Sequence, residues 1–245
     1  MITSLENQRV MEVVRLRRGR ERRATGLFVA EGTREVERAR AAGLTIREMF
    51  VAPELLPDWQ PQHARTEVSS RVLAKMAYRA EPEGVLAVVE APRHTLPDKP
   101  TLVLVAVGIE KPGNLGAMAR TADAAGADAL LTAEAQTDPW NANAIRSSTG
   151  VVFTLPIIET TLEEIAALEL QRVAAVVDAQ TTYTQANLKQ PTALIVGAED
   201  DGLDQRWRDI ADVEVAIPVT GKTADSLNAS AAAALLLYET LRQRG

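Results

Sequence analysis

Short apolar segments alternate with helical patterns through the second half of the chain, and this alternation restricts the folds that the chain can adopt. Apolar runs lie at 101–107, 129–131, 152–155, 173–177, 193–196 and 213–217, with helical patterns at 115–125, 162–168 and 205–210 and again from Ser226. Strands that are apolar on both faces are typical of parallel sheets covered by helices. We therefore predict an α/β fold with a mainly parallel sheet, which binds its ligands in the loops at the carboxyl ends of the strands.

The beginning of the chain predicts a smaller α/β unit. Helical patterns at 5–18, 33–42 and 70–78 are interleaved with apolar runs at 27–30, 46–51 and 85–89. The stretch from Glu90 to Pro100 contains three prolines and few apolar residues. Proline removes backbone donors and stiffens the chain, which is typical of an interdomain linker. We predict a small domain at 1–91, a linker at 92–100 and a second domain at 101–245.

The composition excludes several kinds of site. The 245 residues include no cysteine and two histidines, which excludes a disulfide scaffold, a cysteine nucleophile and a thiolate or histidine-rich metal site. No apolar run is long enough to span a bilayer, and the first residues lack the apolar core of a signal peptide. We therefore expect a cytoplasmic protein that binds neither metal nor membrane.

Positive charge is concentrated near the N-terminus of an acidic chain. The net charge is −6, yet residues 1–23 contain seven arginines and three glutamates, a net of +4, which leaves −10 for the remainder. A dense cluster of this kind indicates a local phosphate-binding patch, with a solvated helix face as the alternative. Its members are Arg15, Arg17, Arg18, Arg20, Arg22 and Arg23.

Three loops of the second domain follow apolar strands and carry polar side chains. Each, taken alone, also fits an ordinary turn or capped helix. Because all three follow strands of one predicted sheet, we expect them to lie at the same edge, where Glu199 could hold Arg120 in a bidentate ion pair. The polar members are Asn114 and Arg120 in the first loop, Glu199 in the second, and Ser226 and Asn228 in the third.

A nucleotide-binding enzyme is the alternative interpretation of the first loop. The spacing Gly113-x-x-Gly116 does not supply the G-x-G-x-x-G pattern of a dinucleotide site, although Glu134 lies at the distance expected of a ribose-binding acid. The chain also lacks the G-x-x-x-x-G-K-[ST] pattern of a phosphate-binding P-loop. The glycine spacing therefore disfavours both nucleotide sites.

Together, the three loops resemble the motifs of the SpoU/TrmH family, the 2′-O-ribose RNA methyltransferases of the SPOUT class. The stretch from Asp138 to Pro156 also looks like the family's linking segment, and residues 28–32 and 83–88 are similar to its small substrate-binding domain. The matching positions are Asn114, Gly116, Arg120, Thr121 and Ala122 in the first loop; Gly197, Glu199, Gly202 and Leu203 in the second; and Ile217, Pro218, Ser226, Leu227, Asn228 and Ser230 in the third.

This resemblance implies a fold, a cofactor and a set of roles. It implies a deep trefoil knot in the second domain, a homodimer, and S-adenosylmethionine held by Gly197, Ile217 and Leu227. It also implies catalytic roles for Arg120, Asn114, Glu199, Ser226 and Asn228, and RNA contacts by Arg146 and Ser148. These would add to the phosphate contacts that the local charge predicts for the N-terminal arginines.

Arg120 raises a chemical question, because relatives use this position next to the reacting hydroxyl. Arginine stays protonated in proteins, so we expect Arg120 to bind the adjacent phosphate and stabilise the developing alkoxide, held there by Ser226 and Glu199. The extra N-terminal domain favours 23S ribosomal RNA as the substrate. A tRNA 2′-O-methyltransferase and a catalytically inert RNA-binding relative are the alternatives.

Overall fold

The computed structural model describes residues 1–59, 64–223 and 225–245. The chain divides into two compact units, one formed by Met1–Arg93 with Trp140–Thr154 and the other by His94–Pro139 with Leu155–Gly245. Within the described residues, no helix is long and apolar enough to cross a membrane.

The second unit is built on a six-stranded sheet in the order β10-β8-β9-β5-β6-β7. Each neighbouring pair of strands is parallel, so all six carboxyl ends lie at one edge, as the apolar runs predicted. The strands are β5 (Leu102–Val107), β6 (Ala129–Ala133), β7 (Ile157–Glu159), β8 (Gln171–Ala175), β9 (Thr192–Val196) and β10 (Val213–Val215).

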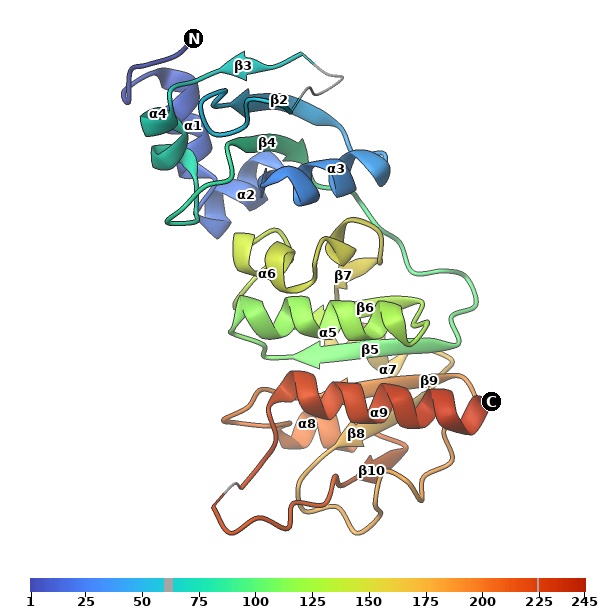
Figure 1. Ribbon diagram of the computed structural model, residues 1–245. Coiled ribbons are helices and arrows are strands. Elements are labelled where there is room, and N and C mark those ends of the chain that lie inside the picture. The colour runs from blue at the N-terminus through green and yellow to red at the C-terminus, as the bar shows by residue number, and fades with distance from the viewer. Residues whose placement is uncertain (60–63, 224) are drawn as a thin grey trace. The chain divides into compact units, whose positions relative to one another are not determined.

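Helices cover both faces of this sheet, which explains why β5, β6 and β9 are buried along their whole length. Helices α7 (Leu162–Ala166) and α8 (Gln205–Asp209) contribute Ile165 and the buried Trp207 to the core on one face. Helices α5 (Pro112–Ala124) and α9 (Ala229–Arg244) pack side by side on the other (Figure 1). The first turns of α5 and α9 therefore lie close together.

The first unit contains a four-stranded sheet in the order β1-β4-β2-β3, with antiparallel pairs except for the parallel pair β2–β3. Its core packs α1 and α4 against the sheet through Val13, Leu73 and Phe50. The elements are α1 (Gln8–Arg15), α2 (Gly19–Thr25), β1 (Leu27–Glu31), α3 (Thr33–Ala41), β2 (Ile46–Val51), β3 (Thr66–Glu67), α4 (Ser70–Met76) and β4 (Val85–Glu90).

Residues 140–154 belong to the first unit although they lie between β6 and β7 in the chain. They form α6 (Ala142–Ser147) and the 3-10 turn η1 (Val151–Phe153). The rings of Trp140 and Phe153 stack on Phe28 of β1, with centroids 4.8 and 5.7 Å away. The strand predicted at 152–155 is therefore wrong, because this apolar run is buried by stacking rather than by a β-ladder.

Two helix predictions also need correction. The helix predicted at 5–18 is shorter and ends at Arg15, and α2 is a separate helix that follows the break. In that break the Arg22 side chain of α2 donates to the carbonyls of Leu16 and Arg17, at 2.8 and 2.9 Å. The last helix begins at Ala229, not near Ser226, and its N-cap is Asn228.

Candidate active site

A cavity of about 370 Å³ opens at the carboxyl ends of β8, β9 and β10. This is the edge at which parallel sheets bind ligands. The three residues predicted from the resemblance to hold the cofactor, Gly197, Ile217 and Leu227, all line it. Further lining residues are Val176, Val177, Asp178, Leu203, Arg208, Val215, Val219 and Ser226.

Gly197 is required by close packing of the backbone in this wall. A Cβ built on Gly197 would lie 2.2 Å from the carbonyl oxygen of Gly202 and 2.8 Å from the nitrogen of Leu203. Atoms cannot approach so closely, and the backbone at these positions cannot swing aside as a long side chain would. The loop 197–203 therefore folds back tightly on itself beside the cavity.

Apolar side chains at the cavity are more exposed than their type predicts. Val177 is 74% exposed, and Val219 and Leu227 are also exposed. Clustered exposed apolar side chains in a concave site mark a ligand surface. Val177 follows the end of β8, so the apolar run at 173–177 continues beyond the hydrogen-bonded strand into the cavity wall.

A fixed carboxylate also lines the cavity. Arg208 binds Glu214 through two bonds of 2.8 and 2.9 Å and reaches Asp178 at 3.2 Å, which raises the pKa of the guanidinium. Asp178 was not predicted as a site residue. The sequence pattern that identified Glu199 could also have identified Asp178, since an acidic residue follows an apolar strand in both cases.

Glu199 joins the first and third predicted loops. Its carboxylate accepts a hydrogen bond of 2.8 Å from the Asn114 amide and another from the Asn228 amide. The Asn228 amide also donates to the Asn114 side-chain oxygen at 3.2 Å. Residues more than 80 positions apart in the chain thus meet at one carboxylate, as the shared sheet edge predicted.

Asn228 has two tasks in this cluster. Its oxygen accepts from the backbone N–H groups of Ser230 and Ala231, which caps the first turn of α9, while its amide nitrogen faces Glu199. The amide is therefore held in one orientation by the helix end. Asn114 lies inside α5, after the N-cap Lys111, and so does not cap that helix.

Lys111 completes the cluster and was not predicted as a site residue. Its ammonium forms an ion pair with Glu199. Hydrogen bonds from Lys111 and then Asn114 lower the pKa of Glu199, and the bond to Glu199 raises the pKa of Lys111. Both groups are thus charged at neutral pH, and Glu199 is a poor proton acceptor.

Arg120 does not form the predicted ion pair with Glu199. Its side chain is exposed and makes no hydrogen bond or ion pair with any residue that the structure describes, and Glu199 binds Lys111 and the two asparagines instead. Ser226 is exposed at the cavity. The positions that the resemblance made catalytic therefore include one tight cluster and one exposed cation outside it.

The N-terminal arginines differ in their surroundings. Arg22 is 6% exposed and its guanidinium is bound by backbone carbonyls, so the prediction that it contacts phosphate is corrected to a structural role. Arg17 is exposed but donates to the carbonyls of Lys75 and Ala77. The remaining members, Arg15, Arg18, Arg20 and Arg23, are exposed.

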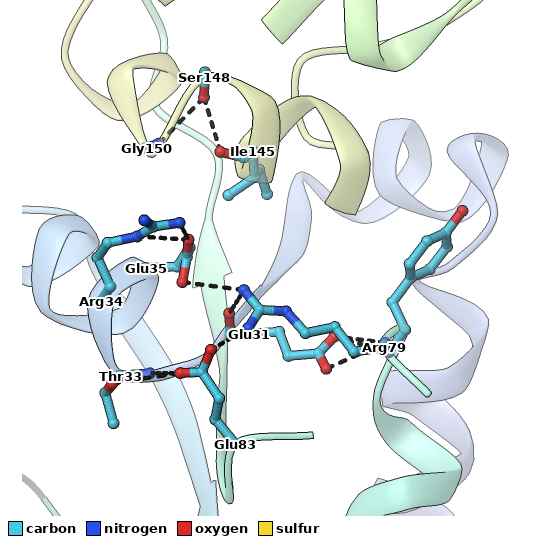
Figure 2. A network of polar contacts seen from close by, with 10 residues as sticks. Glu31, Thr33, Arg34, Glu35, Arg79, Glu83, Ile145, Ser148 and Gly150 are labelled. Carbon is cyan, nitrogen blue, oxygen red and sulfur yellow. Dashed lines mark hydrogen bonds and ion pairs between the residues drawn. The ribbon is translucent and has the colours of Figure 1, made fainter. Parts of the chain in front are cut away.

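Arg146 and Ser148, on the segment that belongs to the first unit, also differ. Arg146 is exposed on α6. Ser148 is fully buried; its hydroxyl donates to the carbonyl of Ile145 at 2.9 Å and accepts from the Gly150 N–H at 3.2 Å (Figure 2). The prediction that Ser148 contacts substrate is therefore corrected: it shapes the turn after α6.

Comparison with known proteins agrees with both units. The model described as the SpoU rRNA Methylase family matches residues 101–238, and that of the MRM3-like substrate binding domain matches residues 7–87. The chain is 30% identical, over 97% of each sequence, to the 23S rRNA (guanosine(2553)-2′-O)-methyltransferase RlmP of Bacillus subtilis.

Two solved structures are similar over nearly the whole chain. One, described as an RNA 2′-O ribose methyltransferase, is 43% identical with a TM-score of 0.84, covering 99% of this chain and 98% of that one. The AdoMet-bound rRNA methyltransferase from Sinorhizobium meliloti is 28% identical with a TM-score of 0.87, covering 98% and 97%. From the match over more than half of its length, this chain belongs to the SpoU rRNA methylase family.

Proposed function

We propose that this chain transfers a methyl group from S-adenosylmethionine to a ribose 2′-hydroxyl in RNA, with 23S ribosomal RNA as the substrate. Family membership makes it an RNA 2′-O-methyltransferase, and its relative RlmP acts on 23S ribosomal RNA. The observation that carries the proposal is the cluster of Asn114, Glu199 and Asn228 beside the cavity at the carboxyl ends of three parallel strands.

The residues of the cavity fit S-adenosylmethionine. Its volume of about 370 Å³ and its exposed apolar wall suit an adenosine, and Gly197 lets the loop 197–203 fold tightly beside that space. The carboxylate of Asp178 suits the hydroxyl and ammonium donors of the molecule. In this proposal Gly197, Ile217 and Leu227 hold the adenosine, and the bound cofactor supplies an electrophilic methyl group.

In this proposal Arg120 stabilises negative charge during methyl transfer and does not act as a general base. Methyl transfer to a hydroxyl is an in-line displacement, in which positioning and stabilisation of negative charge on the attacking oxygen lower the barrier. The guanidinium stays protonated and is not neutralised by any described residue, so it can bind the neighbouring phosphate and the forming alkoxide. Arg120 therefore acts as an electrostatic clamp.

Glu199 acts through the two asparagines. Its carboxylate fixes both amides, and the cap that Asn228 gives to α9 fixes one of them a second time. Asn114 and Asn228 in turn orient the ribose and the cofactor. Ser226 is exposed in the wall of the cavity, where its hydroxyl can help to hold them. This gives Glu199 a positioning role and leaves the contacts with the ribose to the amides.

RNA binding belongs to the first unit in this proposal. The exposed Arg15, Arg18, Arg20 and Arg23, with Arg146, supply cations for phosphate groups. The match to a substrate-binding domain at residues 7–87 supports this assignment. We propose a division of labour between domains at 1–91 and 101–245 joined by a linker at 92–100, except that residues 140–154 pack with the first domain.

Assembly and location complete the proposal. We propose a homodimer, supported by the exposed apolar side chains Leu235, Tyr238 and Leu241, which recur every three residues along α9. The deep trefoil knot implied by the family stays a prediction. A cytoplasmic location is proposed because the bacterial relatives act on ribosomal RNA.

The direct test is transfer of labelled methyl from S-adenosylmethionine to 23S ribosomal RNA by the full chain, with the modified nucleotide mapped. We expect one 2′-O-methylated ribose, absent with an Asn114→Ala variant. Transfer to tRNA in preference to ribosomal RNA would contradict the substrate assignment. Calorimetry without binding of S-adenosylmethionine would instead indicate an inert RNA-binding relative.

A further inference from the structure

Tyr78 is an aromatic side chain that the first unit holds at its surface. It lies in the loop between α4 and β4 and is 49% exposed. Burial of aromatic rings is a large source of folding free energy, and a ring left half in water forgoes much of it. The open part of the ring is available to a planar ligand that can stack on it.

The backbone under this ring is fixed. The N–H groups of Tyr78 and Arg79 donate to the buried carboxylate of Glu31, at 2.8 and 3.2 Å. Figure 2 shows Glu31, Glu35 and Glu83 gathered around Arg79, whose guanidinium pairs with Glu35 at 3.4 Å and with Glu83. The loop is therefore rigid where Tyr78 leaves it.

The ring itself is also oriented. The Asn143 amide donates to the Tyr78 hydroxyl oxygen at 3.2 Å, and Asn143 lies in the first turn of α6. One edge of the ring is thus tied down although half of its surface is open. A flat surface ordered in advance loses little conformational entropy when a planar ligand binds.

Two arginines near Tyr78 keep their positive charge. Arg17 and Tyr78 line one small hollow, and Arg17 is bound there by the carbonyls of Lys75 and Ala77, which are uncharged. Arg146 and Tyr78 line a second hollow, and Arg146 makes no ion pair with any described residue. Glu31 lines both hollows and Glu35 lines the second, but Glu31 is bound by backbone N–H groups and Glu35 by Arg34 and Arg79. Both cations can therefore bind phosphate groups.

A half-exposed aromatic ring that shares its two hollows with arginines outside any described ion pair matches the chemistry of an unpaired nucleotide. Bases in single strands stack on aromatic side chains while their phosphates bind arginine, whereas bases in a duplex have no free face. We infer that Tyr78 is a stacking platform for an unpaired base of the RNA substrate, with Arg17 and Arg146 on the adjoining phosphates. This inference rests on the proposed RNA methyltransferase function.

The test separates the ring from the hydroxyl. Binding of a fluorescent single-stranded RNA of about twelve nucleotides is compared for the full chain and for Tyr78→Phe and Tyr78→Leu. We expect Tyr78→Leu to weaken binding about tenfold and Tyr78→Phe to weaken it less than twofold, because stacking needs the ring alone. Leu55→Ala is the matched control, an exposed apolar residue of the same unit whose loss should leave binding unchanged.

A spectroscopic readout guards against misfolded variants. With the unchanged chain, a single-stranded RNA containing 2-aminopurine should lose fluorescence on binding, because stacking quenches that base, and a duplex of the same sequence should bind more weakly. Equal binding by Tyr78→Leu and the unchanged chain, or an equal loss in Tyr78→Phe and Tyr78→Leu, would overturn the inference. If that occurs while the chain still methylates ribosomal RNA, the proposed function stands; absence of both RNA binding and methylation would remove both.

Discussion

The two units of the molecule each contain a carboxylate cluster, and the clusters are built in different ways. In the first unit, Glu31 and Glu35 are buried and their charges are compensated by arginines and backbone N–H groups. In the second unit, the Glu199 side chain is 20% exposed and binds two amides and a lysine beside a cavity. In both clusters the carboxylates fix the position of neighbouring groups, which are backbone N–H groups and arginines in the first and side-chain amides in the second.

The two clusters differ in whether they leave polar groups accessible to a ligand. Around Glu31 and Glu35 the hydrogen bonds hold backbone and neighbouring charges in place, so the cluster supports a fold. Around Glu199 the bonds orient the side chains of Asn114 and Asn228, and Arg120, further along the helix that carries Asn114, keeps an uncompensated charge. A compensated, buried network stabilises structure, whereas an accessible network with uncompensated charge is suited to a ligand.

Removal of the Arg120 charge should have the largest effect. We expect Arg120→Ala to lower kcat about 10³-fold, equivalent to about 4 kcal/mol, because the forming alkoxide loses its stabilising cation. Arg120→Lys should remain at least tenfold slower, because an ammonium lacks the planar fork. Methyl-transfer kinetics measure both changes.

Two controls test this assignment. Arg120 does not line the cavity, so calorimetry should give an unchanged affinity for S-adenosylmethionine in both variants. Arg206→Ala removes another exposed arginine of the same unit, one that pairs with Asp204 and Glu134, and should leave kcat within about twofold. Near-normal turnover by Arg120→Lys would exclude the bidentate role.

Disruption of the first cluster should act on stability and leave the chemistry intact. Glu35 is 2% exposed and pairs with Arg34 and Arg79. Glu35→Ala should lower the free energy of unfolding by about 3 kcal/mol, because Arg79 loses a buried partner. Urea unfolding measures this loss.

The matched control is Glu37→Ala on the same helix. Glu37 pairs with Arg40 at the surface, so its loss should cost less than about 0.5 kcal/mol. Binding of S-adenosylmethionine should be unchanged in both variants. A loss of cofactor affinity in Glu35→Ala with unfolding unaffected would show that the buried cluster is not purely structural.

The two tasks of Asn228 can be separated by a conservative change. Serine caps helices about as well as asparagine, so Asn228→Ser should keep the free energy of unfolding within about 0.5 kcal/mol. It removes the amide that binds Glu199 and Asn114, and we expect kcat to fall about 30-fold, roughly 2 kcal/mol. Unchanged kcat in a stably folded variant would leave Asn228 as a helix cap alone.

The sequence predicted the parts of the fold whose causes are local. The runs that became β5 and β9 are apolar on both faces, and such runs are recognisable without knowledge of their neighbours. The loops after these strands were expected at one sheet edge because parallel strands share their carboxyl ends. The sequence alone therefore groups Asn114, Glu199 and Asn228.

What the sequence could not predict depends on non-local partners. Strand order places β9 beside β5, and this neighbourhood gives Glu199 the partners Asn114 and Lys111 in place of Arg120. The run at 152–155 has the composition of a strand, but its burial comes from stacking of Phe153 on Phe28. Arg22 looks like its neighbours in sequence, yet a break between two helices captures its guanidinium.

The smallest expected effect comes from Lys111, because it tunes Glu199 and touches neither the ribose nor the cofactor in the proposed mechanism. The ordinary pKa of a glutamate is 4.5, and the bonds from Lys111 and Asn114 lower that of Glu199. A lowered pKa in the folded state stabilises the cluster at pH values above 4.5, and this stabilisation is lost as the pH falls through the lowered value. Lys111→Ala should raise the pKa of Glu199, so the cluster should lose its stabilisation at a higher pH than in the unchanged chain.

A side-chain carbon NMR titration of Glu199 measures the shift, and kcat near neutral pH should fall by no more than about threefold, because the ion pair is exposed to solvent. Lys75→Ala is the control, a lysine of the first unit bound to the carbonyl of Leu5, and it should leave the Glu199 titration unchanged. A collapse of activity in Lys111→Ala to the level of Arg120→Ala would mean that the lysine itself contacts the reacting groups. The Glu199 cluster would then supply a second catalytic cation besides Arg120, in addition to orienting the two asparagines.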